Sequence, residues 1–162
     1  MTVFAQLGAL RFGAKRGVIS LIGTDVEYVL AEAGKTLSLR SDSRYEEGDA
    51  LWHGAGALKD KAGVGHIVLQ RLTGTPKKAA EPYLIVKDLA NDPHFNQLSI
   101  VKEWTHARFL ACYPLKTPDG YVIGMFCWRS LYNLVSPIVQ WYRRVTIVTD
   151  LSCVIWSQNG DI

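Results

Sequence analysis

The chain has few cysteines, and none stand at a spacing that holds a metal. Its 162 residues include Cys112, Cys127 and Cys153, with no C-x-x-C pair among them. Neither a zinc cluster nor a disulfide framework is therefore expected. On the two strands predicted below, Cys112 and Cys127 are diagonal neighbours with Cα atoms about 7 to 8 Å apart, too far for a good disulfide, although a bulge at Gly120 would change that register. We predict buried free thiols and a cytoplasmic protein without a metal site.

Long apolar runs and a strong charge of one sign are also lacking. The formal net charge is +3, and the basic residues lie among acidic ones. No cationic stripe is offered to nucleic acid. No apolar run reaches the roughly 18 residues of a membrane-spanning helix, so neither nucleic acid nor a membrane is expected as a partner.

Common catalytic and phosphate-binding motifs are missing too. Gly8 and Gly13 have the spacing of a phosphate-binding loop, but Ala14-Lys15 stands where lysine and serine or threonine are required. The chain contains no G-x-S-x-G nucleophile elbow and no H-E-x-x-H zinc helix. These absences exclude the best-known hydrolase and nucleotide-binding signatures.

What the chain has is the composition of one globular domain spanning residues 1–162. Hydrophobic residues make up 48% and charged residues 20% of the sequence. A chain of this length buries enough surface to fold without disulfides.

Periodicity predicts an α+β domain. The expected elements are an N-terminal helix (1–13), strands at 16–22 and 26–34, a short helix from Gly65, strands at 83–89, 107–115 and 121–128, and a closing helix (137–158). The turn Thr117-Pro118-Asp119-Gly120 pairs the last two strands as a hairpin. Helices at both ends would cover one face of a mainly antiparallel sheet, and the long connections within 16–128 would cover the other.

Three stretches of sequence resemble GAF domains. They are FGAKRGVISLIGTDVEYVLAEAGKTLSL, DPHFNQ and ARFLACYPLKTPDGYVIGMFCW, within residues 4–130. The resemblance is closest to the GAF domains ahead of the kinase core in fungal hybrid histidine kinases. It implies a GAF-like, PAS-related sheet of six antiparallel strands with a loop-roofed ligand pocket. No kinase, cyclase or DNA-binding segment accompanies it, so a free-standing protein is expected.

The resemblance does not assign a cofactor. Residues 91–97 lack the lysine and the acidic pair of the cyclic-nucleotide branch, and no cysteine has the histidine neighbour typical of bilin attachment. The cysteines lie in apolar strands and in the last helix, not in the loop position that sulfoxide reduction uses. The cofactor therefore remains unknown.

Three residues are candidate acids or bases. Glu32 is in phase with Val26, Tyr28 and Leu30, so it is either a cavity acid or a strand-end residue facing water. His66 opens the predicted helix after glycines and either transfers a proton or simply begins the helix. Asp88 follows a strand and serves either the cavity rim or a turn.

Six further residues are candidate ligand contacts, because aromatic rings and a guanidinium suit an organic ligand with an acidic group. They are Asn91, Phe95, Trp104, His106, Arg108 and Tyr113. In the alternative, Phe95 fills the core and Arg108 braces a loop.

Three functions remain open at this stage. The first is a small-molecule sensor or regulatory module that signals to a partner protein or within a homodimer. The second is an enzyme that uses the same pocket to cyclise or isomerise a specialised metabolite. The third is a dimerisation module without a ligand.

Overall fold

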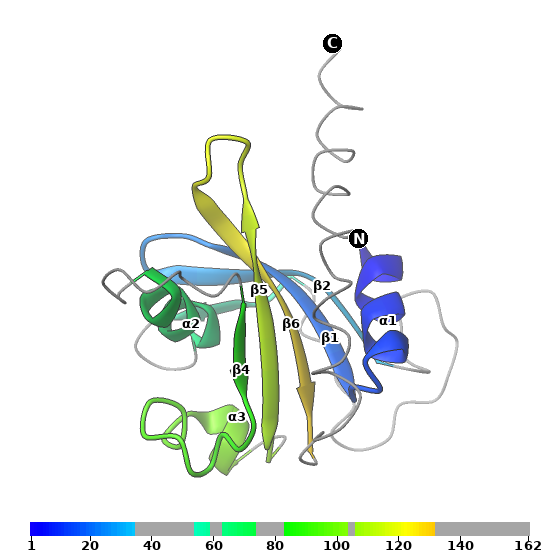
Figure 1. The fold of residues 1–162 in the computed structure, drawn as a ribbon, viewed down its shortest axis with the longest axis vertical. Coiled ribbons are helices and arrows are strands. Elements are labelled where there is room, and N and C mark those ends of the chain that lie inside the picture. The colour runs from blue at the N-terminus through cyan, green and yellow to red at the C-terminus, as the bar shows by residue number, and fades with distance from the viewer. Residues whose placement is uncertain (35–53, 59–62, 74–82, 104–105, 132–162) are drawn as a thin grey trace.

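The computed structural model describes residues 1–34, 54–58, 63–73, 83–103 and 106–131 (Figure 1). The elements in chain order are α1 (Thr2–Arg11), β1 (Arg16–Ile22), β2 (Val26–Gly34), β3 (Gly56–Leu58), α2 (Val64–Thr73), β4 (Leu84–Val86), α3 (Ser99–Lys102), β5 (Phe109–Lys116) and β6 (Val122–Ser130). The closing helix predicted over 137–158 lies outside the described residues.

The strands form one antiparallel sheet in the order β3-β2-β1-β6-β5-β4. Its centre is the β1–β6 pair, which joins the two ends of the described chain (Figure 1). The α+β architecture with one antiparallel sheet, predicted from the sequence, is confirmed. Strand β3 was missed, because three residues are too few to show an alternating pattern.

The β5–β6 hairpin corrects the prediction for the cysteines. Its turn places Gly120 at φ 87°, and Thr117 Oγ1 accepts a hydrogen bond from the backbone N–H of Tyr121. The register shifts between Leu115 and Lys116, so that Cys112 lies directly opposite Cys127. Their Cα atoms are 4.1 Å apart, and the two residues form a disulfide. The prediction of free thiols at these two positions was wrong for two reasons. The connection is one residue longer than the expected turn, since Lys116 pairs with Val122, and the register shift adds one more residue, so the diagonal neighbours become a direct pair.

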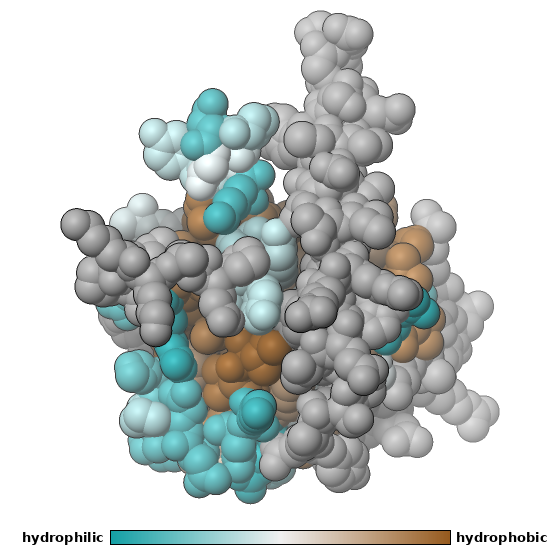
Figure 2. All heavy atoms as spheres, in the orientation of Figure 1, coloured by the Kyte–Doolittle hydropathy of each residue, from teal (hydrophilic) through white to brown (hydrophobic). Residues whose placement is uncertain are grey.

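One face of the sheet packs against α1, and we call it the helix face. The helix turns its small residues Ala5, Gly8 and Ala9 to the sheet. The larger apolar residues that suggested the helix lie on its outer side and are exposed, for example Leu7 (58%) and Leu10 (54%). Brown atoms at the right of Figure 2 lie over this side of α1. The helix therefore forms where the sequence predicts it but buries a different side, since only small residues allow it so close to the sheet.

The other face lies under α2, α3 and residues 87–103, and we call it the loop face. Its core includes Val68 of α2, Leu110 of β5 and Met125 of β6. Leu89 and Phe95 come from the loop and are fully buried against them. Hydrophilic side chains gather on the outside of the α3 region, at the lower left of Figure 2. The described part of this face is thus a packed layer with a polar outer surface.

Candidate functional site

The loop face carries most of the buried polar side chains of the described residues. Among the described residues, six polar or charged ones are buried: Arg16, Ser20, Glu27, Glu32, Arg129 and Ser130. The strand registers place all of them except Ser130 on the loop face. The helix face is lined by Ala, Ile, Phe and Trp side chains instead. Because buried polar groups are costly unless they are paired, each of these five residues needs a partner.

Arg16, Glu32 and Arg129 form a buried ion cluster at one end of the sheet. Arg129 Nη2 donates a hydrogen bond of 2.6 Å to Glu32 Oε1, and Arg16 Nη1 lies 3.6 Å from the same oxygen. Burial lowers the pKa of Arg129, the Glu32 carboxylate opposes this, and the charge of Arg16 lowers the pKa further. Of the two roles open for Glu32, the strand-end residue facing water is wrong, since Glu32 is fully buried.

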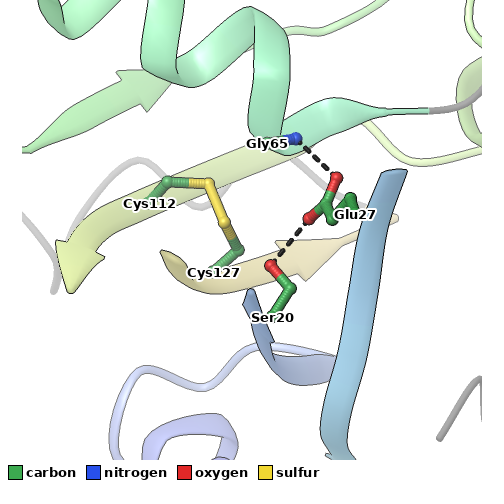
Figure 3. The surroundings of a disulfide bond; sticks show 5 residues. All are labelled: Ser20, Glu27, Gly65, Cys112 and Cys127. Carbon is green, nitrogen blue, oxygen red and sulfur yellow. Dashed lines mark hydrogen bonds between the residues drawn. A yellow bond between two sulfur atoms is a disulfide. The ribbon is translucent and has the colours of Figure 1, made fainter. Parts of the chain in front are cut away.

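Ser20, Glu27 and Gly65 form a second buried group, which we call the cap cluster (Figure 3). Ser20 Oγ donates to Glu27 Oε1 at 2.7 Å, and the backbone N–H of Gly65 donates to Glu27 Oε2 at 2.8 Å. The carboxylate thereby caps the first turn of α2, where negative charge is favourable. A Cβ on Gly65 would lie 2.8 Å from Glu27 Cδ, so a larger residue there would displace the carboxylate from the first turn of α2.

Glu27 was missed in the sequence because the alternation along β2 is broken. The β1–β2 register shifts between Ile19 and Ser20. As a result, Glu27 and Glu32 share the loop face although they are five positions apart, and Tyr28 is exposed. The predicted common phase of Glu32 and Tyr28 was wrong for the same reason.

The Cys112–Cys127 disulfide lies beside the cap cluster on the loop face (Figure 3). Cys112 is fully buried and Cys127 is 8% exposed. Both belong to the core that contains Val68 of α2. The disulfide is therefore part of the surface on which α2 rests.

His66 lies in the first turn of α2, at the far end of the sheet from Glu32. Its Nε2 donates to the carbonyl oxygen of Gly23 at 2.9 Å, and its buried Nδ1 has no hydrogen-bond partner within the described ranges. Glu32 pairs with Val18, which lies five positions before Gly23 along β1. That separation corresponds to about 16 Å. The structure therefore does not bring His66 and Glu32 together around one reacting group.

Asp88, Asn91 and Arg108 do lie together, at the edge of the loop face. Asp88 Oδ2 accepts a hydrogen bond of 2.8 Å from Asn91 Nδ2, and Asp88 Oδ1 lies 3.6 Å from Arg108 Nη1. Asp88 Oδ1 also accepts from the backbone N–H of Ala90 at 3.1 Å, as in a turn. Asn91 and Arg108 are exposed and remain accessible to a small molecule.

The remaining predicted ligand contacts are spread over the molecule. Phe95 is fully buried in the core of the loop face, with Arg71 Cζ 6.0 Å from its ring centroid. His106 is exposed and has a left-handed backbone, φ 45°. Tyr113 follows Cys112 and so faces the other way, into the Phe109, Ala111 and Trp128 cluster on the helix face. Tyr113 therefore lies on the opposite side of the sheet from Phe95. Trp104 lies outside the described residues.

A further ionic contact joins α2 to the loop. Arg71 Nη1 donates to Asp92 Oδ2 at 2.8 Å, and the backbone N–H of His94 donates to Asp92 Oδ1 at 2.9 Å. Burial of Asp92 raises its pKa, but the His94 backbone and the Arg71 guanidinium outweigh it, so that the pKa lies below 3.8. The two residues are 21 positions apart, so no periodic pattern predicts their contact.

Metal and membrane features can be stated for the described part of the chain. Within it, no group of three or more His, Cys, Asp or Glu side chains is placed to hold a metal ion. Among its helices, none has the length and apolar character needed to cross a membrane.

The fold and the polar loop face define a class of small α+β domain in which an antiparallel sheet carries a helix on one face and long crossovers on the other. Solved GAF domains have this fold. The phycocyanobilin-bound GAF domain of a cyanobacterial phytochrome aligns with a TM-score of 0.62 at 12% identity, over 97% of this chain and 82% of that chain. A far-red cyanobacteriochrome photoreceptor also aligns with a TM-score of 0.62, at 13% identity, over 98% of this chain and 85% of that chain.

An enzyme is also among the similar structures. The free methionine-R-sulfoxide reductase of Neisseria meningitidis, solved with its substrate, aligns with a TM-score of 0.54 at 13% identity, over 94% of this chain and 71% of that chain. No protein-family model and no curated protein matches the sequence. At these identities the likeness establishes the fold, which hosts several functions.

Proposed function

We propose that this chain is a sensory or regulatory GAF-type module that binds a small organic molecule at its loop face. The observation that carries the proposal is the difference between the two faces of one sheet. The helix face is apolar, whereas the loop face holds two buried carboxylates, two buried arginines and a buried serine. Apolar residues in place of buried ion pairs often make a protein equally stable or more stable. The stability of the fold therefore does not by itself explain why the loop face carries polar groups.

The edge of the loop face supplies the first contacts for such a ligand. Arg108 offers a guanidinium for a carboxylate or another acidic group, and Asn91 offers an amide. Both are held near the same carboxylate, that of Asp88. Phe95 supports the loop from below as a core residue, in place of the direct contact expected from the sequence.

The proposal extends to the setting of the module. We assign it a cytoplasmic location and a kinship with the GAF domains of fungal hybrid histidine kinases, on the stretches of sequence quoted above. Its output passes to a partner protein or to a second copy of the chain. One structural neighbour is bound to phycocyanobilin, but no cysteine here stands beside a histidine, so we propose a ligand held without a covalent bond.

An enzyme in the same fold is the weaker candidate. A reductase is among the structural neighbours, but acid and base catalysis needs both groups within hydrogen-bond reach of one substrate. His66 and Glu32 are held at opposite ends of the sheet, and each already has a partner in the described structure. No contact in the described residues favours turnover over binding.

Native mass spectrometry of freshly purified protein tests the proposal. We expect a mass increment from a retained small molecule, which denaturation releases. Arg108→Ala should weaken binding of the isolated compound about tenfold, the effect of losing one charge-assisted hydrogen bond. Lys116→Ala, an exposed cation at the other end of β5, is the matched control and should bind normally.

Two results would contradict the proposal, one against binding itself and one against the site assigned to it. One is a folded protein that retains no compound and whose Tm is unchanged by a panel of organic acids and heteroaromatic metabolites. The other is equal binding by Arg108→Ala and the parent, which would place the ligand elsewhere. A dimer without any ligand would favour the dimerisation module.

A further inference from the structure

We propose that the Cys112–Cys127 disulfide is a redox-sensitive switch, whose reduction loosens α2 from the loop face. The effect on ligand binding rests on the function proposed above, whereas the movement of α2 does not. The starting observation is the register, which sets the two cysteines directly opposite one another in the middle of the β5–β6 pair.

The disulfide is tightly surrounded by core side chains, so its two sulfur atoms have little room to move apart. Cys112 is fully buried, Cys127 is 8% exposed, and both pack in the core with Val68 of α2 and with Phe95. Figure 3 shows the disulfide next to the first turn of α2, where Glu27 accepts the hydrogen bond from Gly65. The pair is thus close both to the core side of α2 and to its N-terminal attachment.

Reduction changes the space that the two sulfur atoms need. A covalent bond becomes a contact between two thiols, and non-bonded atoms stay farther apart than bonded ones. Protein interiors are too densely packed to absorb this locally. The strands cannot separate easily, because β6 is hydrogen-bonded to β5 on one side and to β1 on the other. The helix above is the element free to move outward.

The chemistry is thiol–disulfide exchange with a dithiol such as dithiothreitol or a cellular redox protein. One reductant thiolate attacks a sulfur of the pair and releases the other as a thiolate, which takes up a proton. The second reductant thiol then resolves the mixed disulfide, leaving two protein thiols and an oxidised dithiol. In the cytoplasm, the location proposed for this chain, disulfides are usually transient or redox-sensing rather than structural.

Hydrogen exchange of the oxidised and reduced protein tests the switch. A Cys153→Ser background leaves only one pair to titrate, and alkylation followed by mass measurement counts free thiols. After oxidation with glutathione disulfide we expect none, and after dithiothreitol two. Peptides covering residues 64–73 should exchange on the order of tenfold faster in the reduced form, while those of β1 and β6 should keep their protection.

A double variant distinguishes two effects of reduction, the larger space that the two sulfur atoms need and the loss of the covalent bond between them. In Cys112→Ala/Cys127→Ala, two methyl groups need less room than two sulfur atoms, so α2 should exchange as in the oxidised protein, with or without dithiothreitol. Exchange like that of the reduced protein would overturn the packing argument.

Three results would overturn the switch itself. They are equal exchange of α2 in both redox forms, loss of protection throughout β1 and β6 on reduction, and thiols that never pair under oxidation. The exchange experiment needs no ligand, so its outcome is independent of the binding proposal. The redox dependence of any compound retained in native mass spectrometry tests the coupling of the two.

Discussion

At the scale of single residues, the two buried glutamates have different tasks. Glu27 satisfies backbone and hydroxyl donors at the start of α2, whereas Glu32 neutralises two arginines that would otherwise be buried with like charge. Removing one partner of a buried pair costs far more than the intact pair contributes, because it leaves a charge without compensation. The ion cluster is therefore sensitive to changes at Glu32.

Glu32→Gln should lower the free energy of unfolding by about 3 kcal/mol. The amide still accepts a hydrogen bond but leaves Arg16 and Arg129 uncompensated by a carboxylate. Urea denaturation measures the change, with the exposed Glu103→Gln as the control. A loss of less than about 1 kcal/mol, the range of a surface pair, would contradict the role assigned to the cluster.

At the scale of elements, α2 is the cover of the loop face and is attached at both ends. Glu27 of β2 holds its first turn, and Asp92 of the loop holds Arg71 in its last turn. Between them Val68 reaches the core. A ten-residue helix has little stability by itself, so these attachments determine how firmly it rests on the sheet.

The Arg71–Asp92 attachment should make stability depend on acid pH. The folded-state pKa of Asp92 lies below its usual value of 3.8, so its contribution is complete above the unfolded pKa and is lost as pH falls through the folded one. Arg71 is 36% exposed, and solvent screening limits the contribution to about 1 kcal/mol. We expect Asp92→Asn to be less stable than the parent by that amount at pH 7, with the difference shrinking as pH falls below 3.8 and on through the lower folded-state pKa.

Denaturation of both proteins across this pH range provides the measurement. Asp119→Asn, at the exposed hairpin turn, is the control and should follow the parent at every pH. A constant difference between Asp92→Asn and the parent from pH 7 to pH 2 would show that the charge of Asp92 has no part in the attachment.

At the scale of the whole molecule, one sheet separates two layers of different character. The helix layer sits so close that the position of Gly8 has no room for a side chain. A Cβ there would lie 2.3 Å from Trp128 Nε1 and 2.8 Å from Phe126 Cζ. These rings stack with centroids 4.3 Å apart, which leaves them little freedom to yield.

Gly8→Ala tests this close approach, because two effects of opposite sign compete. Helix propensity favours alanine by about 1 kcal/mol, whereas overpacking costs about 1 to 3 kcal/mol. We expect overpacking to dominate and the Tm to fall. Leu10→Ala, on the exposed side of α1, should change Tm little. A Tm for Gly8→Ala equal to or above that of the parent would contradict the close contact.

Part of the fold and of the candidate site followed from local patterns. The hairpin of β5 and β6 was predicted from its turn residues, and α1, β1, β2 and α2 from the spacing of apolar residues. Asp88, Asn91 and Arg108 were selected as polar residues at strand ends, and they do lie together. The pairing of strand β3 and the Arg71–Asp92 contact depend on segments distant in sequence, for which no local pattern exists.

The sequence by itself determined most of the order of elements and a mainly antiparallel sheet, because periodicity and turn chemistry act over a few residues. The GAF-like form of that sheet was implied by the resemblance of three stretches of sequence. Only the tertiary structure decided which residues meet. Side chains alternate with a period of two, so one irregularity sends every later residue to the other face. The shift at Leu115 and Lys116, together with a connection one residue longer than expected, pairs the cysteines, and the shift at Ile19 and Ser20 brings both glutamates to the loop face. Both shifts are fixed by pairing between strands, which no local pattern records.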